Sequence, residues 1–110
     1  MFVAEREHPP WSFLTNHAQV LACIAGDPGI RLRDIGDTVG LTERAVHRIV
    51  DELEAAGYLA RERRGRRNHY TVRSQLPLPD PLARGQKVGV LLRILGGEGN
   101  EKARDRGPSR

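Results

Sequence analysis

Several kinds of residue are scarce in this 110-residue chain, and each scarcity excludes something. Cys23 is the only cysteine, so no internal disulfide can form, and a reducing compartment is the simplest expectation. The longest apolar stretches, 20–25 and 88–92, are far shorter than the roughly 20 residues of a membrane-spanning helix. Residues 1–10 carry charges where a secretion signal has an apolar core. We therefore expect a cytoplasmic protein with no membrane partner.

Catalytic and metal-binding patterns are also missing. The sequence has no paired carboxylates, no nucleophile motif and no glycine-rich phosphate loop. His17 and Cys23 lie six positions apart on one expected helix, and the Cys-x-Cys pairing of metal-responsive regulators is absent. We expect no enzyme activity, no cofactor and no metal site, and Cys23 is expected to pack as an apolar residue.

Lysine is nearly absent too, since Lys87 and Lys102 are the only two lysines among 18 basic residues. The formal net charge is +4 and the isoelectric point is about 10.0, which favours a polyanionic partner. Residues 61–73 hold six of the 18 basic residues but one of the 14 acidic residues. Outside this segment acidic residues outnumber basic ones by one, so all net positive charge lies within it. The arginine bias of a GC-rich genome is the alternative explanation.

The first half of the chain predicts three helices. A first helix runs to about residue 25 and begins at Thr15 or Asn16, either of which can cap it. The Gly-Asp-Pro-Gly sequence at 26–29 breaks it. A short helix over 32–39 follows and ends at Gly40, where the backbone can adopt a positive φ. Thr42 then caps a third helix over 43–56, which ends at Gly57.

The third helix has two distinct faces. Its apolar side chains fall on one side of the helix, and the width of that side is the one expected for a helix packed on a core. These residues are Ala45, Val46, Ile49, Val50, Leu53 and Ala56. Arg44, His47, Arg48 and Asp51 fall on the opposite side. Only residues 40–42 separate this helix from the one before it, which is typical of a helix-turn-helix.

A basic hairpin is expected next. Strands over 58–63 and 68–72 are predicted by their β-branched and aromatic residues, with Gly65 in the turn between them. A two-stranded hairpin is not stable alone, so it must pack on the helices. Arg61, Arg63, Arg64, Arg66 and Arg67 lie in or beside its turn.

The ends of the chain are simpler. The apolar residues Trp11, Phe13 and Leu14 are expected to pack on the domain, which we place at 11–74. A proline-rich stretch over 75–84 is expected to be an extended linker. A helix over 85–95 follows, and the tail over 96–110, which has no large apolar side chain, is expected to be disordered.

Three helices followed by a basic hairpin resemble the winged helix-turn-helix fold of bacterial transcription regulators, in particular the MarR-like group and its small single-domain relatives. The resemblance rests on Leu32-x-x-Ile35-x-x-x-Val39-Gly40-Leu41-Thr42, on Val46-x-x-Ile49-Val50-x-x-Leu53 followed by Gly57-Tyr58-Leu59, and on the basic segment up to Tyr70. It covers about residues 15–72. The implied fold is mainly α with a small β-hairpin wing: a three-helix core plus wing, with a short C-terminal helix.

The resemblance implies a double-stranded DNA partner, with residues 43–56 as the recognition helix and 61–69 as the wing. The groove-facing candidates would be Thr42, Glu43, Arg44, His47 and Arg48. Bidentate contacts from arginine to guanine discriminate bases by roughly 1–3 kcal/mol. The wing candidates for backbone or minor-groove contact are Arg61, Arg63, Arg64, Arg66 and Arg67.

This chain lacks the long terminal helices with which the larger MarR-like proteins form dimers. We expect the stripe formed by Val88, Leu91, Leu92 and Leu95 to contact a second copy, although folding back on its own domain is the alternative. A homodimer would bind two half-sites about one helical turn, roughly 10 bp, apart. A winged-helix protein-interaction module without specific DNA binding is the competing function. The sequence does not identify an effector.

Overall fold

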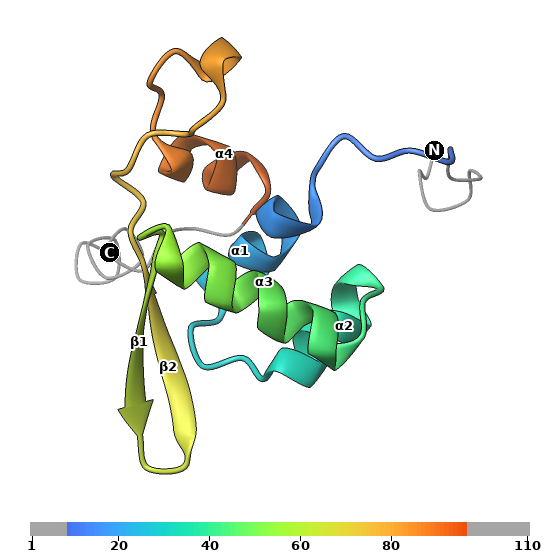
Figure 1. The fold of residues 1–110 in the computed structure, drawn as a ribbon, viewed down its shortest axis with the longest axis vertical. Coiled ribbons are helices and arrows are strands. Elements are labelled where there is room, and N and C mark those ends of the chain that lie inside the picture. The colour runs from blue at the N-terminus through green and yellow to red at the C-terminus, as the bar shows by residue number, and fades with distance from the viewer. Residues whose placement is uncertain (1–8, 97–110) are drawn as a thin grey trace, which may run out of the picture.

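Four α-helices and one β-hairpin make up residues 9–96, the part of the chain that the computed structural model describes. Figure 1 shows the first three helices grouped together, with the hairpin projecting from the group and the last helix lying on the side away from the hairpin tip. The expected winged-helix fold is therefore confirmed. In chain order the elements are α1 (Asn16–Gly26), α2 (Leu32–Val39), α3 (Glu43–Ala55), β1 (Leu59–Arg64), β2 (Arg67–Val72) and α4 (Val88–Ile94).

Short-range signals set the helix ends. Thr15 caps α1, since its hydroxyl oxygen accepts a hydrogen bond from the Ala18 backbone N–H at 3.1 Å. Thr42 caps α3 in the same way, accepting from the Ala45 N–H at 3.0 Å. Gly40 ends α2 with φ of 80°, a conformation that side chains other than glycine rarely adopt. The predicted bounds of α2 and the predicted Thr42 cap are both confirmed.

The turn between α2 and α3 depends on Gly36. Its carbonyl oxygen accepts hydrogen bonds from the N–H groups of Gly40, at 2.8 Å, and Leu41, at 2.9 Å. This pair of hydrogen bonds brings the chain back so closely that a Cβ atom on Gly36 would overlap the Leu41 carbonyl oxygen. Backbone atoms cannot swing away as a flexible side chain can. Only a residue without a side chain at position 36 therefore allows α3 to begin this close to α2.

We expect Gly36→Ala to lower the free energy of unfolding by about 1–3 kcal/mol, the range for overpacking a close contact. Urea denaturation followed by circular dichroism measures it. Gly29→Ala is the matched control, because a Cβ there meets its nearest neighbours, in Arg67 and His69, at an ordinary 3.9 Å. That change should stay within about 0.5 kcal/mol. Equal losses in the two variants would show that the turn is not tightly packed at Gly36.

The hairpin is an antiparallel pair that opposes Leu59 to Val72 at its base and Arg64 to Arg67 at its tip. Its two-residue turn begins with Gly65 at φ of 62°, as hairpin turns with a leading glycine do. Two contacts fasten β2 to the loop between α1 and α2. The Tyr70 N–H donates to the Pro28 carbonyl oxygen at 3.0 Å, and the Arg67 guanidinium donates to the Gly29 carbonyl oxygen. The wing is therefore held beside the helix-turn-helix.

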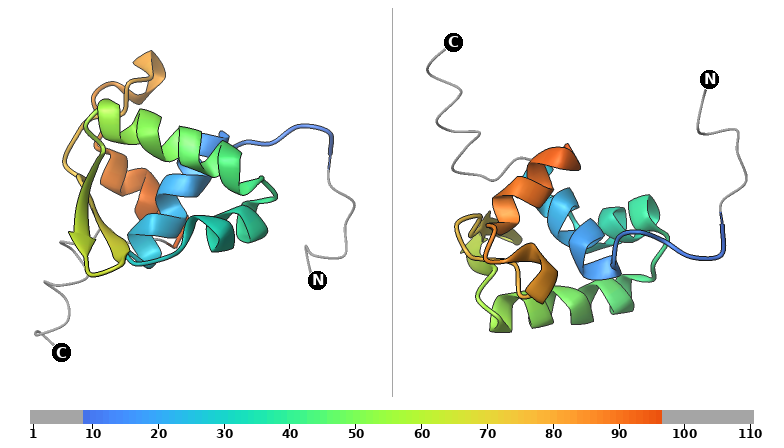
Figure 2. Two further views of the ribbon diagram at one scale, coloured as in Figure 1. Left: turned by 60° about the horizontal axis from the view of Figure 1, so that its bottom comes forward. Right: turned by 90° about the horizontal axis from the view of Figure 1, so that it is seen from above.

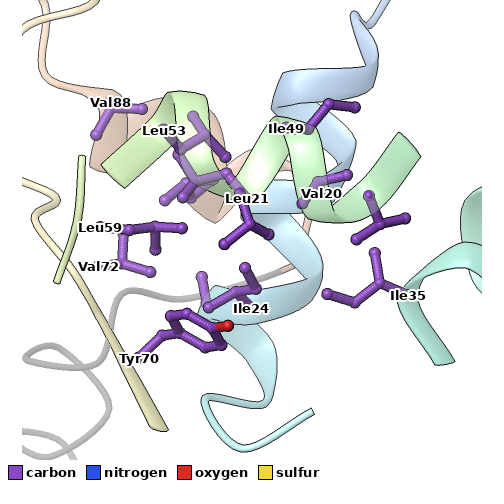
Figure 3. Packing of buried hydrophobic residues seen from close by; sticks show 14 residues of the cluster. Val20, Leu21, Ile24, Ile35, Ile49, Leu53, Leu59, Tyr70, Val72 and Val88 are labelled. Atoms are coloured by element: carbon purple, nitrogen blue, oxygen red, sulfur yellow. The ribbon is translucent and has the colours of Figure 1, made fainter. Parts of the chain in front are cut away.

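One apolar cluster joins the helices to the base of the hairpin (Figure 3). Val20 and Ile24 of α1 are fully buried and lie at its centre, facing side chains from α3 and from both strands. Tyr70 and Val72 close it on the hairpin side. Burial of each such side chain stabilises the fold by roughly 1.5–3 kcal/mol before entropy is counted. The same cluster therefore sets the position of α3 and the base of the wing together.

The segment after the hairpin corrects two expectations. It is not an extended linker: Pro77 forms a bridge with Lys87, and Pro81–Ala83 form a turn of 3-10 helix between them. The loop therefore closes on itself and returns the chain to the body. The final helix begins at Val88 rather than near residue 85, and it packs against α1 (Figure 2).

The expectation for the start of the domain is also wrong in part. Trp11 and Phe13 do not pack on the domain, since their side chains are 59% and 89% exposed. The predicted tail lies outside the described residues apart from Gly96. Within residues 9–96, no helix has the length and apolarity needed to cross a lipid bilayer.

Candidate nucleic-acid interface

The outer face of α3 carries the predicted groove-facing side chains together. Glu43, Arg44, His47, Arg48 and Asp51 line one shallow surface along this helix. All five are exposed, while Val46, Ile49, Val50 and Leu53 on the other side of the helix are buried. The amphipathic division expected from the sequence is thus confirmed. The face stands clear of the rest of the body in Figure 1, so a duplex could approach it.

Acidic residues on α3 would repel a phosphate backbone unless they were compensated. Asp51 lies 3.2 Å from the His47 Nδ1 atom and 3.4 Å from an Arg61 nitrogen. Glu54 makes a closer ion pair with Arg61. These contacts place positive charge beside both carboxylates. Glu43 sits instead at the first turn of α3, where the helix dipole favours a negative charge.

A second set of contacts joins α1 to the outer face of α3. The His17 Nε2 atom lies 2.7 Å from a Glu52 carboxylate oxygen, and the other Glu52 oxygen lies 3.5 Å from an Arg48 nitrogen. The hydrogen bond from His17, followed by the charge of Arg48, lowers the pKa of Glu52 below its ordinary value. Arg48 therefore pairs with Glu52 and not with Asp51. Arg44 has no ion pair among residues 9–96, so its cation is the one on this face that DNA could engage without displacing an acid.

The wing arginines differ in what already holds them. Arg61 is not a free cation: its hydrogen bond to Glu54, aided by the nearby acids, raises its pKa and fastens the base of the wing to α3. The DNA contact expected of Arg61 stays a prediction, and that contact would have to compete with Glu54. Arg64 lies 3.3 Å from Glu62, an exposed pair of little strength. Arg63 donates to the Gly65 carbonyl oxygen at 3.2 Å, and Arg66 makes no ion pair within the described part of the chain.

A hollow of about 380 Å³ lies between the wing and the start of α2, and it contains two arginines that sequence patterns did not reveal. Arg31 and Arg33 line it together with Arg66 and Arg67. The loop after α1 brings these residues to the wing through its contacts with Tyr70 and Arg67. The sequence did contain a sign of them, since these two arginines flank the first residue of α2, and the N–H groups at a helix N-terminus also attract anions. Four arginines from two segments thus surround one concave surface.

The predicted dimer stripe is divided by the structure. Val88 and Leu92 are 4% and 0% exposed because they pack into the core of their own chain, so they are not surface contacts. The stripe folds back on its own domain at these two positions. Leu91 and Leu95 remain half-buried. The exposed apolar residues of α4 are Val90 and Ile94, at 36% and 75%.

Cys23 is half-buried against the core, and that burial raises the pKa of its thiol. A thiol with a raised pKa is a weak nucleophile and a poor metal ligand at neutral pH. Among residues 9–96, no group of three His, Cys, Asp or Glu side chains is placed to hold a metal ion.

A capped helix after a tight turn, with a basic hairpin fixed beside it, defines a winged helix-turn-helix protein. The sequence profile of the MarR family matches residues 12–67, which is just over half of the chain. The chain belongs to the MarR family and is a winged-helix transcription regulator. Among solved structures it is similar to a MarR family protein of Mycobacterium tuberculosis in complex with salicylic acid, with 21% identity and a TM-score of 0.49, over 87% of this chain and 74% of that chain. No curated protein matches significantly.

Proposed function

We propose that this regulator binds double-stranded DNA sequence-specifically as a homodimer. The arrangement of α3 and the wing supports it: an exposed helix face with Arg44 lies near a basic hollow formed by Arg31, Arg33, Arg66 and Arg67. Glu43 lines both surfaces, so they are contiguous. A duplex that receives α3 in its major groove would bring its phosphates to the hollow and to the wing.

The two surfaces have separate tasks in this proposal. Arg44 and Arg48 project from the first two turns of α3, where side chains of a recognition helix meet base edges. Arg63, Arg64, Arg66 and Arg67 contact phosphates or the minor groove, and Arg31 and Arg33 contact phosphates at the start of α2. Thr42 caps α3, and the N-terminus of that helix faces the phosphate backbone of the DNA. Specificity comes from the helix, and most of the affinity comes from the arginines around it.

A salt titration of duplex binding tests the function as a whole. Each phosphate contact by a basic side chain contributes about 0.9 to the slope of log affinity against log salt. Five or six such contacts from each subunit should therefore give a slope of about 5 per half-site, or about 10 for the homodimer. A random-oligonucleotide selection should enrich an inverted repeat with half-sites about 10 bp apart or a multiple of that spacing. Absence of binding at low salt, or binding that hardly changes with salt, would favour a protein-interaction module.

A further inference from the structure

An apolar groove of about 550 Å³ lies between the end of α3 and α4, the helix that Figure 1 shows on the side away from the hairpin tip. Its walls come from the start of α1, the end of α3, the loop over 78–80 and α4 (Figure 2). His17, Glu52 and Asp80 add polar atoms along it. A volume of this size is typical of a pocket that buries a bulky apolar group. The main apolar lining residues are Leu21, Leu53, Leu78, Val88, Leu91 and Leu92.

Two aromatic side chains lie unused beside this groove. Trp11 and Phe13, here called the aromatic arm, pack edge to face on one another with ring centroids 5.0 Å apart. They are 59% and 89% exposed, although the chain has only five aromatic residues in all. No residue from 9 to 15 is charged. Large exposed apolar patches on soluble proteins mark interaction sites.

The rings of the arm do not fill their own groove: Phe13 is among its lining residues, yet both side chains remain mostly exposed. Ser12 and Leu14 form a local turn, in which the Ser12 hydroxyl donates to the Leu14 carbonyl oxygen at 3.0 Å. The side-chain amide of Gln19 also donates to that oxygen, at 3.2 Å, and so connects the turn to α1. Phe13 reaches the rim of the groove, but the chain before it leads outward from the body, as Figure 1 shows. The arm and the groove therefore form one continuous surface whose two parts do not fill each other.

We propose that the aromatic arm of one subunit occupies the groove of a second copy of this chain, and that the exchange is reciprocal. One continuous surface that carries both a projecting group and a matching hollow satisfies the two-fold symmetry of an isologous dimer. This proposal rests on the homodimer in the proposed function and names its interface. In this dimer, the arm of one subunit would lie beside His17 and Glu52 in the other subunit's groove, and Glu52 pairs with Arg48.

The area involved is sufficient for a specific dimer. An aromatic side chain offers about 200 Å², so the exposed parts of Trp11 and Phe13 amount to about 300 Å² for each arm. Two arms and the two groove surfaces that they cover bury about 1,200 Å² in total, the lower limit for specific interfaces. Leu82, which is 87% exposed two residues beyond the groove-lining Asp80, can add to it. A dimer of moderate affinity is expected.

Trp11 is the only tryptophan in the chain, so its fluorescence reports directly on the arm. In a dilution series of the full chain, the emission maximum should move to shorter wavelength as sedimentation shows dimers forming. Trp11→Ala with Phe13→Ala should weaken dimerisation about 30-fold or more, as loss of central aromatic contacts does. Ile94→Ala removes an apolar side chain that is 75% exposed but does not line the groove, and it should change nothing.

A mixing experiment tests the exchange itself. Leu91→Lys puts a charge into the groove while leaving the arm intact, and circular dichroism checks that the variant folds. Mixed with the arm variant, it restores one of the two arm–groove contacts, so the mixture should form more dimer than either variant alone. If Trp11 stays exposed to solvent in the dimer and the arm variant still dimerises, this interface is wrong but the homodimer is not. A monomer with a buried Trp11 would place the arm in its own groove and overturn it as well. A monomer at all concentrations that still binds duplex would reject the dimer and keep DNA binding.

Discussion

Arg63→Glu with Arg66→Glu should reduce affinity for duplex DNA by about 100-fold or more at moderate salt, because like charges placed against each other cost several kcal/mol. Both side chains lie at the tip of the wing, and neither makes an ion pair within residues 9–96. Each substitution turns an attraction to phosphate into a repulsion. The loss should be similar for every DNA sequence, because phosphate contacts position the protein without reading bases. Fluorescence anisotropy with one specific and one unrelated duplex measures both effects.

Removing the charges without reversing them gives a finer test. Arg63→Ala with Arg66→Ala should lower the salt slope by about 2 for each subunit, or about 4 for the homodimer, because each of these arginines would no longer neutralise a phosphate. Arg84→Glu with Arg93→Glu is the matched control for the charge reversal, since it changes the net charge equally on the loop and helix away from the wing tip (Figure 1). If this control loses as much affinity as the reversed wing variant, only the overall charge matters and the wing makes no local contact.

Arg44→Ala should cost about 5- to 150-fold in affinity for each half-site of the selected DNA, which corresponds to the roughly 1–3 kcal/mol of a bidentate base contact. Affinity for unrelated duplexes should change much less. Arg44 lies in the first turn of α3, is exposed and has no acidic partner among the described residues. Its guanidinium can therefore meet a guanine without first breaking an ion pair. Competition binding against the selected site and against single-base variants shows which base position loses discrimination.

Arg48→Ala is the comparison that the structure makes useful. Arg48 lies one turn further along the same face, but Glu52 lies 3.5 Å from it and is itself fastened by His17. DNA would have to compete with that carboxylate, so the loss should be smaller than for Arg44. Glu52→Gln should then raise affinity, because it releases Arg48 and removes a negative charge. Equal losses for Arg44→Ala and Arg48→Ala, with no gain for Glu52→Gln, would show that the ion pair does not restrain Arg48.

Local patterns predicted the helix-turn-helix closely. Thr42, Gly40 and the apolar spacing of α3 act over four residues or fewer, so the sequence displays each of them directly. The wing was also predictable, since strand-forming residues flank Gly65 and five arginines lie within four residues of it. The strands begin or end one residue away from their predicted positions at most places, because hairpin ends depend on the turn geometry.

Patterns over longer distances were less informative. Apolar character alone could not show that Val88 and Leu92 enter the core while Trp11 and Phe13 stay in water. The prolines over 77–81 suggested an extended linker, but the bridge between Pro77 and Lys87 closes that segment. Arg31 and Arg33 were missed because nothing near them in the sequence indicates the wing, which folds back to them from more than 30 residues away.

The sequence by itself determined the order of the elements, the buried and exposed faces of α3 and the location of the positive charge. These properties follow from interactions between neighbours along the chain, which a single turn of helix or a hairpin already contains. The tertiary structure decided which arginines keep an unpaired charge and which apolar side chains lack a partner. Glu54 forms an ion pair with Arg61, Glu52 forms one with Arg48, and Val88 is buried in the core. Such outcomes require that distant residues come within contact distance, and only the packed fold brings them there.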